Sequence, residues 1–207
     1  MQHENPQDPP DRAGTVEGAL LPADTLLVRL RHQTALLAAA DLLRADPTVD
    51  PHWSGLLHDY ALVSDRVVSV HGDAEAATLG WLKPRGVVAL LVTEECSDAG
   101  TVEHLAASLS AMNAVALTVD DERARRLRPV LDALSKLLPD AFAGLPVRPH
   151  VRYPPGAMAA VLTPHTLYRS WAPPEELPEA AGDDDGRLAL LTLYGRMRQL
   201  DVRPEEG

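Results

Sequence analysis

Apolar residues recur at helical spacing in two stretches near the start of the chain. Between Asp24 and Pro47 they lie three or four residues apart, which is the pattern of an amphipathic helix. Asp24 is a residue type that caps helices, and Pro47 ends the pattern because proline cannot continue a helix. A second helix is predicted over residues 53–61, followed by a short strand at residues 67–70.

The middle of the chain alternates between strand and helix patterns. Residues 85–92 (RGVVALLV) are an unbroken apolar and β-branched run, which is typical of a strand buried on both faces. A helix is predicted at residues 98–112 and a second buried strand at residues 114–119. The next helix, at residues 127–138, contains Pro129, which kinks it or separates its first turn. This order predicts a parallel sheet and the α/β fold class.

The last third of the chain is rich in proline and glycine. A third parallel strand is predicted near residues 157–162, and a last helix with an apolar face at residues 188–200. The chain is therefore expected to divide into a disordered tail (1–20), an α/β domain (21–172), an acidic Pro-rich linker (173–186), and a C-terminal helix and tail (187–207).

Composition narrows the class of protein. The net charge is −11 and the basic residues are scattered, which argues against a nucleic-acid partner. The single cysteine, Cys96, excludes an internal disulfide, and residues 1–20 lack the basic and apolar character of a secretory signal. No apolar run approaches the roughly 20 residues that cross a bilayer. We therefore expect a cytoplasmic protein with no membrane partner.

A set of short motifs resembles one enzyme family. The motifs are DYALVSD, HGD at residues 71–73, KPRGVVALLV, TEECS, HLAASLSAMNAVAL and TVDD. Their order is similar to that in the cofactor domain of aldehyde dehydrogenases, and the spacing from Gly86 to Asn113 matches that family without a gap. The resemblance covers residues 25–135. It implies a three-layer, Rossmann-like parallel sheet with flanking helices, the fold with which that family binds NAD.

The departures from the family fall at its functional positions. Thr93, Glu94 and Glu95 stand where the family has P-W-N, and a carboxylate at Glu95 would repel the oxyanion that the family's Asn stabilises. Thr118 replaces the family's ribose-binding Lys, and Asp121 replaces its ribose-binding Glu. The E-L-G-G, G-Q-x-C and F-T-G-S motifs are absent from the sequence. We expect no catalytic residue, and the five positions are interpreted as vestiges that bind no cofactor.

These observations favour a non-catalytic relative, a pseudoenzyme that serves as a structural or regulatory partner of an active dehydrogenase. Similar roles are known for the cysteine-less second module of two-module aldehyde dehydrogenases and for the C-terminal domain of long proline-utilisation flavoproteins. The expected partner is an active aldehyde dehydrogenase or a second copy of the chain.

Three alternatives stay open. One is a nucleotide or small-molecule binding protein that uses the crevice after Val92 and Val119, at the carboxyl ends of the strands. Another is a component of an NAD(P)-dependent aldehyde oxidoreductase, with NAD or NADP as its cofactor. The third is an enzyme of another class built around Glu94, Glu95 and the histidines. No metal site is expected, because the histidines match no standard ligand spacing.

Overall fold

The computed structural model of the protein describes residues 23–72, 77–145, 156–177 and 182–202; the expected tail at residues 1–20 lies outside them. The helices are α1 (Ala23–Arg44), α2 (Pro51–Val63), α3 (Asp98–Ser110), α4 (Asp121–Arg126), α5 (Arg128–Leu137) and α6 (Asp184–Leu193), with a 3₁₀ turn, η2 (Ser64–Val67). The strands are β1 (Val68–Gly72), β2 (Ala77–Pro84), β3 (Val87–Val92), β4 (Ala114–Thr118), β5 (Phe142–Leu145), β6 (Met158–Leu162), β7 (Thr166–Arg169), β8 (Glu175–Glu176) and β9 (Gly195–Val202).

Short polar side chains set the starts of several helices. Asp50 caps α2 by accepting a hydrogen bond from the His52 backbone N–H at 2.9 Å. Ser97 caps α3 and Asp183 caps α6 in the same way. Asp183 belongs to the segment 173–186 that was expected to be a linker, so part of that segment is a helix start and another part is strand β8.

Four parallel strands form the centre of a six-stranded sheet with the order β5-β4-β3-β6-β7-β8. β3 pairs in parallel with β4 on one side and with β6 on the other, which confirms the α/β class and the three predicted parallel strands. β7 and β8 add antiparallel pairs at one edge, and β5 extends the other edge in parallel. These three short strands were not predicted.

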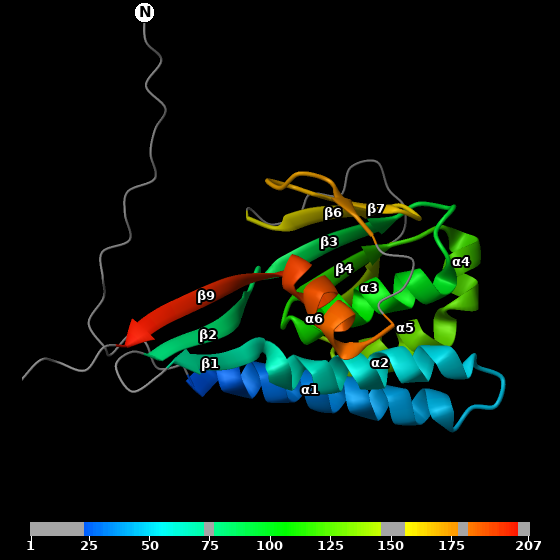
Figure 1. Ribbon diagram of the computed structural model, residues 1–207. Coiled ribbons are helices and arrows are strands. Elements are labelled where there is room, and N and C mark those ends of the chain that lie inside the picture. Colours follow the sequence, from blue (N-terminus) through cyan, green and yellow to red (C-terminus); the bar gives the residue numbers. More distant parts are fainter. Residues whose placement is uncertain (1–22, 73–76, 146–155, 178–181, 203–207) are drawn as a thin grey trace, which may run out of the picture.

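The helices lie in layers on one face of this sheet (Figure 1). α3 packs on β3 and β4, and α1 and α2 pack against α3. Val88, Leu90 and Val92 of β3 are buried, but Leu91 is 40% exposed. The expectation that residues 85–92 are buried on both faces is therefore wrong for Leu91. The helix predicted over residues 127–138 is α5, with Pro129 in its first turn, and a separate short helix, α4, precedes it.

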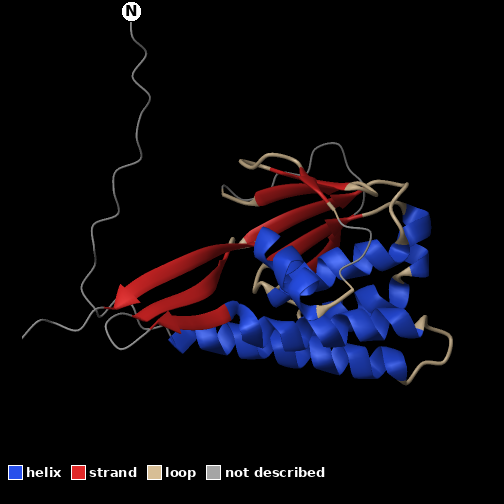
Figure 2. Ribbon diagram, viewed as in Figure 1, coloured by secondary structure: helices blue, strands red, loops and turns tan. Residues whose placement is uncertain are grey.

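A second, three-stranded antiparallel sheet projects from the body as an arm, with the order β1-β2-β9 (Figure 2). β9 pairs with β2 along its whole length, from Gly195 opposite Pro84 to Val202 opposite Ala77. The helix expected over residues 188–200 therefore ends at Leu193, and its second half is strand instead. Backbone pairing with β2 explains the difference, because tertiary pairing overrides a local helical pattern.

The apolar face of α6 is buried, as its pattern requires. Leu190, Leu191 and Tyr194 have 8% or less of their surface exposed, and α6 contacts α2 and α3. None of the helices within the described ranges combines the length and the apolar character needed to span a membrane. The cytoplasmic location stays a prediction.

Candidate functional site

The five positions interpreted as vestiges lie at or just beyond the carboxyl ends of two central strands of the large sheet. Thr93, Glu94 and Glu95 follow the carboxyl end of β3, Thr118 is the last residue of β4, and Asp121 is the first residue of α4. Because β3 and β4 are parallel neighbours, their carboxyl ends lie side by side. The structure thus brings together the residues that the sequence marked. Thr118 is buried, Thr93 is half-buried, and the other three side chains are exposed.

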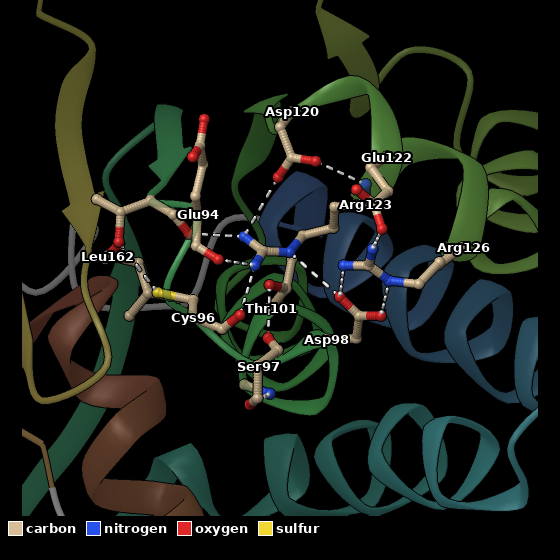
Figure 3. Close-up of polar contacts among 12 residues, drawn as sticks. Glu94, Cys96, Ser97, Asp98, Thr101, Asp120, Glu122, Arg123, Arg126 and Leu162 are labelled. Atoms are coloured by element: carbon tan, nitrogen blue, oxygen red, sulfur yellow. Dashed lines mark hydrogen bonds and ion pairs between the residues drawn. The ribbon is translucent and has the colours of Figure 1, made fainter.

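The side chain of Arg123, which is 1% exposed, reaches from α4 to the loop that follows β3 (Figure 3). Its guanidinium donates to the carbonyl oxygen of Thr93 at 2.7 Å and to that of Glu94 at 2.9 Å. It also donates to the carbonyl oxygen of Cys96, and its Nε donates to Asp98 Oδ1 at 3.2 Å. One side chain therefore fixes the whole loop that follows β3.

Local sequence explains how Arg123 reaches this position. Asp120 caps α4 by accepting a hydrogen bond from the Arg123 backbone N–H at 2.7 Å, so Arg123 sits in the first turn of that helix. Asp98 opens α3 on the facing side and binds both Arg123 and Arg126. The Arg126 Nε lies 2.6 Å from Asp98 Oδ2, and Arg126 also pairs with Glu122 at 3.0 Å.

Three carboxylates near these strand ends, those of Asp98, Asp120 and Glu95, are held in their ionised form. Hydrogen bonds from Arg126 and then from Arg123 lower the pKa of Asp98, although its burial acts in the opposite direction. The backbone N–H of Arg123 lowers the pKa of Asp120, and backbone and Thr93 hydrogen bonds lower the pKa of Glu95. Asp98 and Asp120 form ion pairs with Arg123 and Arg126. The negative charge that an anionic group would meet here is that of Glu94 and Glu95, which are exposed.

The residues near the carboxyl ends of β3 and β4 are poorly suited to bind a dinucleotide. The positive end of α3 is compensated by its own residues, since Ser97 accepts from the Gly100 N–H at 2.9 Å and Asp98 lies in the first turn. Pyrophosphate groups bind such helix starts through free backbone N–H groups. The Thr118 hydroxyl is buried and has no hydrogen-bond partner among the described residues, so it offers nothing outward to a ribose.

Sequence reasoning missed the groups that dominate the site. Arg123, Asp98, Asp120 and Arg126 were not singled out, although an aspartate directly after a buried strand and three residues before an arginine signals a capped helix. The partners of Arg123 are mostly backbone carbonyls, and these leave no trace in side-chain patterns.

The other chemical candidates take structural positions. The Cys96 thiol is buried and donates to the carbonyl oxygen of Leu162 at 3.2 Å. Glu94 and Glu95 are exposed, and Figure 3 shows the Glu94 side chain pointing away from Arg123. Among the described residues, no three His, Cys, Asp or Glu side chains are grouped so that they could hold a metal ion.

Comparison with known proteins gives a result for structure but not for sequence. No protein-family model matches the chain, and no curated protein matches its sequence. A Burkholderia cenocepacia protein assigned as an aldehyde dehydrogenase is 16% identical over 64% of this chain and 32% of its own, with a TM-score of 0.51. PnpE in complex with nicotinamide adenine dinucleotide is 16% identical over 64% of this chain and 32% of its own, with a TM-score of 0.50. A point variant of Bradyrhizobium japonicum proline utilization A is 14% identical over 67% of this chain and 20% of its own, with a TM-score of 0.51.

These solved structures are members of the aldehyde dehydrogenase family, and they share the fold of the described residues. The resemblance noted in the sequence is thereby confirmed at the level of fold. This chain spans about a third or less of the length of each solved structure, with 32%, 32% and 20% covered.

Proposed function

We propose that this chain is a non-catalytic protein with the fold of an aldehyde dehydrogenase cofactor domain, and that it serves as a structural or regulatory partner of an active dehydrogenase. The buried side chain of Arg123 is the observation that carries the proposal. The family resemblance puts the ribose contacts of the cofactor at Thr118 and Asp121, just before Arg123. Here the Arg123 guanidinium turns inward and binds three carbonyl groups of the chain's own loop after β3.

The charges near the ends of β3 and β4 also support a non-catalytic role. A dehydrogenase of this type stabilises a developing oxyanion and binds cofactor phosphates, and both tasks need hydrogen-bond donors. The ends of β3 and β4 instead carry the exposed carboxylates of Glu94 and Glu95, and hydrogen bonds lower the pKa of Glu95. The donors of Arg123 are used by the chain's own carbonyls and by Asp98.

The projecting arm supports a role in binding a protein. The side chains of residues 196–199 in β9 are all exposed, so both faces of this strand are open to solvent. Lys83 lies opposite Arg196, and Trp81 lies opposite Arg198, which puts three basic residues on one face. A basic face on a chain of net charge −11 is complementary to an acidic surface of a partner.

Cofactor binding tests the non-catalytic part of the proposal. Calorimetric titration of the purified chain with NAD and with NADP should give no binding, while an active aldehyde dehydrogenase measured alongside should bind. Aldehyde oxidation by the chain alone should also be undetectable. A micromolar dissociation constant for either dinucleotide would contradict the proposal and favour a nucleotide-binding protein or an oxidoreductase component.

A binding experiment tests the proposed role as a partner of an active dehydrogenase. The chain should form a complex with a purified aldehyde dehydrogenase encoded in the same genome, measured by light scattering after size-exclusion chromatography. Arg198→Glu, on the basic face of the arm, should weaken that complex about tenfold or more, and higher ionic strength should weaken it too. Arg128→Glu is the matched control, because Arg128 is also an exposed arginine but lies on α5.

Two outcomes would reject the partner role. One is that no such dehydrogenase forms a complex, and the other is that both variants weaken the complex equally. A stable dimer of the chain alone, lost in Arg198→Glu, would identify a second copy as the partner instead.

A further inference from the structure

A cavity of about 220 Å³ lies beside the carboxyl ends of β3 and β6. It is several times larger than the ~30 Å³ that one water molecule occupies in the liquid. Its walls come from α3, α6, β8 and the loops that follow β3 and β6. β4 lies on one side of β3 and β6 on the other, so the cavity adjoins the point where the strand order reverses, the place where open α/β sheets bind ligands.

Much of the cavity wall is apolar. Its apolar side chains come from the end of β6, from β8 and its neighbour, and from α6; they are Leu162, Pro164, Leu177, Ala189, Leu190 and Leu193. Small-molecule sites have this character, with a few polar groups that fix orientation.

The ionisable groups of the wall are acidic. Glu103 of α3 and Glu175 and Glu176 of β8 line the cavity, and the wall contains no Lys or Arg. Arg169 pairs with Glu175 at 3.3 Å, which leaves Glu103 and Glu176 without a guanidinium partner among the described residues. Arg187, the nearest cation on α6, is engaged by Asp59 at 2.8 Å and by Asp184 at 3.3 Å.

Glu103 is held in place by a neighbouring hydroxyl. The Tyr60 O–H donates to Glu103 Oε1 at 3.1 Å, from α2. Burial raises the pKa of Glu103, although Tyr60 and Arg187 act in the opposite direction. A positive group in the cavity would offset this burial, because an opposite charge favours the ionised carboxylate.

The one histidine of the wall adds no positive charge at neutral pH. His104 is 4% exposed, and its Nδ1 lies 2.7 Å from the Tyr194 hydroxyl. Burial lowers the pKa of His104 to about 4. Among the described residues, no hydrogen bond to its other ring nitrogen is present, so a neutral, nearly buried polar atom remains for a ligand.

From this combination we infer that the cavity between α3, α6 and β8 binds a small apolar molecule that carries a protonated amine. The apolar wall would bury its hydrocarbon part, and Glu103 with Glu176 would bind its ammonium group. A metal ion is not the favoured cation, because no group of three ligating side chains is found in the described part of the chain. Arg123 does not line this cavity, and among the described residues Cys96 is the one that both lines it and accepts a hydrogen bond from Arg123.

A matched pair of probes tests the inference. Calorimetric titration at pH 7 should show that 2-phenylethylammonium binds, and that 2-phenylethanol, which has the same ring and chain without the charge, binds about tenfold or more weakly. Equal affinity for the two probes would overturn the inference, and so would the absence of ammonium binding at millimolar concentration.

Two variants locate the bound probe. Glu103→Gln keeps an acceptor for Tyr60 and removes the charge, so the ammonium should bind about tenfold or more weakly, whereas Glu122→Gln on α4 should change nothing. Ala189→Phe should abolish binding, because Ala189 is exposed and lines the cavity. Thr34→Phe, at an exposed position of α1, is its control.

The variants can overturn the inference as well. Unchanged binding in either Glu103→Gln or Ala189→Phe, or equal weakening in a variant and its control, would place the probe elsewhere. Circular dichroism of each variant confirms the fold, and the Glu103→Gln pair decides the question alone if Ala189→Phe does not fold.

Discussion

Arg123 shows how a buried charge is accommodated in this protein. A guanidinium has five N–H donors and stays protonated, so burial is tolerated only when most of those donors are bonded. Here they meet three carbonyl oxygens and the carboxylate of Asp98, while a second arginine, Arg126, shares that carboxylate. The result is a loop after β3 that is fixed from the inside by a residue of α4.

Removing Arg123 should therefore destabilise the fold strongly. Arg123→Ala leaves three inward carbonyl groups without their donor, and the free energy of unfolding should fall by about 3 kcal/mol. Arg126→Ala is the control, because Arg126 is the other partner of Asp98. Its side chain is 44% exposed, so solvent screens that ion pair. Urea denaturation followed by circular dichroism measures both. Equal losses would mean that Arg123 contributes only surface charge.

Part of this site could be predicted from the sequence. The motif resemblance marked Glu95 and Thr118, and the parallel strands bring those positions to one edge. Arg123 could not be found this way, because its role depends on carbonyl groups about 30 residues away in sequence. Side-chain patterns report periodicity and motifs, but they contain no information on which backbone groups a distant side chain will reach.

His104 gives the fold a pH dependence whose sign follows from its burial. Its pKa is lowered to about 4, against 6.5 for a free histidine. Well above pH 6.5 His104 is neutral in both the folded and the unfolded state. As the pH falls from 6.5 to 4, the unfolded chain takes up a proton that the folded protein does not, so the free energy of unfolding should fall by about 3 kcal/mol.

Urea denaturation across this pH range, in the wild type and in His104→Gln, measures the effect. The variant should lose less stability on acidification. Some pH dependence should remain in it, because burial also lowers the pKa of His32. Identical pH profiles for the two proteins would refute the assignment.

At the scale of elements, long periodic segments were predictable and short edge strands were not. The run of residues 87–92 and the helix that Ser97 caps follow from local pattern alone. β5, β7 and β8 have only two to four residues each, so their identity depends on a partner strand and not on their own sequence. For β9, apolar residues at helical spacing predicted a helix, and pairing with β2 determined the outcome.

Gly195 is the position where that pairing requires a particular residue. A Cβ atom at Gly195 would lie 2.4 Å from Cδ1 and 2.5 Å from Cγ of Leu82, a side chain that is 1% exposed. Gly195→Ala should therefore lower the free energy of unfolding by about 1–3 kcal/mol, because the buried leucine would have to move as a whole.

Gly144→Ala is the matched control for this prediction. Gly144 also lies in a strand, β5, and a Cβ there would meet no atom within 4 Å. Thermal or urea denaturation compares the two variants. If both change stability to the same extent, the close approach of β9 to Leu82 does not constrain the sequence.

At the scale of the whole molecule, the C-terminal segment is joined to the body by polar contacts as well as apolar ones. The Asn113 side chain accepts from the backbone N–H groups of Arg85 and Gly86 at 2.8 and 3.2 Å and donates to the carbonyl oxygen of Tyr194 at 2.9 Å. It thereby connects the start of β3, the end of α3 and the end of α6. Arg187 of α6 adds an ion pair to Asp59 of α2 at 2.8 Å.

These contacts argue that α6 unfolds together with the α/β core, although the sequence pattern placed residues 187–207 in a separate unit. Hydrogen exchange followed by mass spectrometry, at increasing urea, should give peptides from α6 and α3 the same opening free energy and the same urea dependence, because both would exchange through global unfolding. Asn113→Ala should lower the two values in parallel. An α6 that opens at a much lower free energy than α3 would show that the C-terminal segment is an independent unit, and the pocket that it helps to line would then form only transiently.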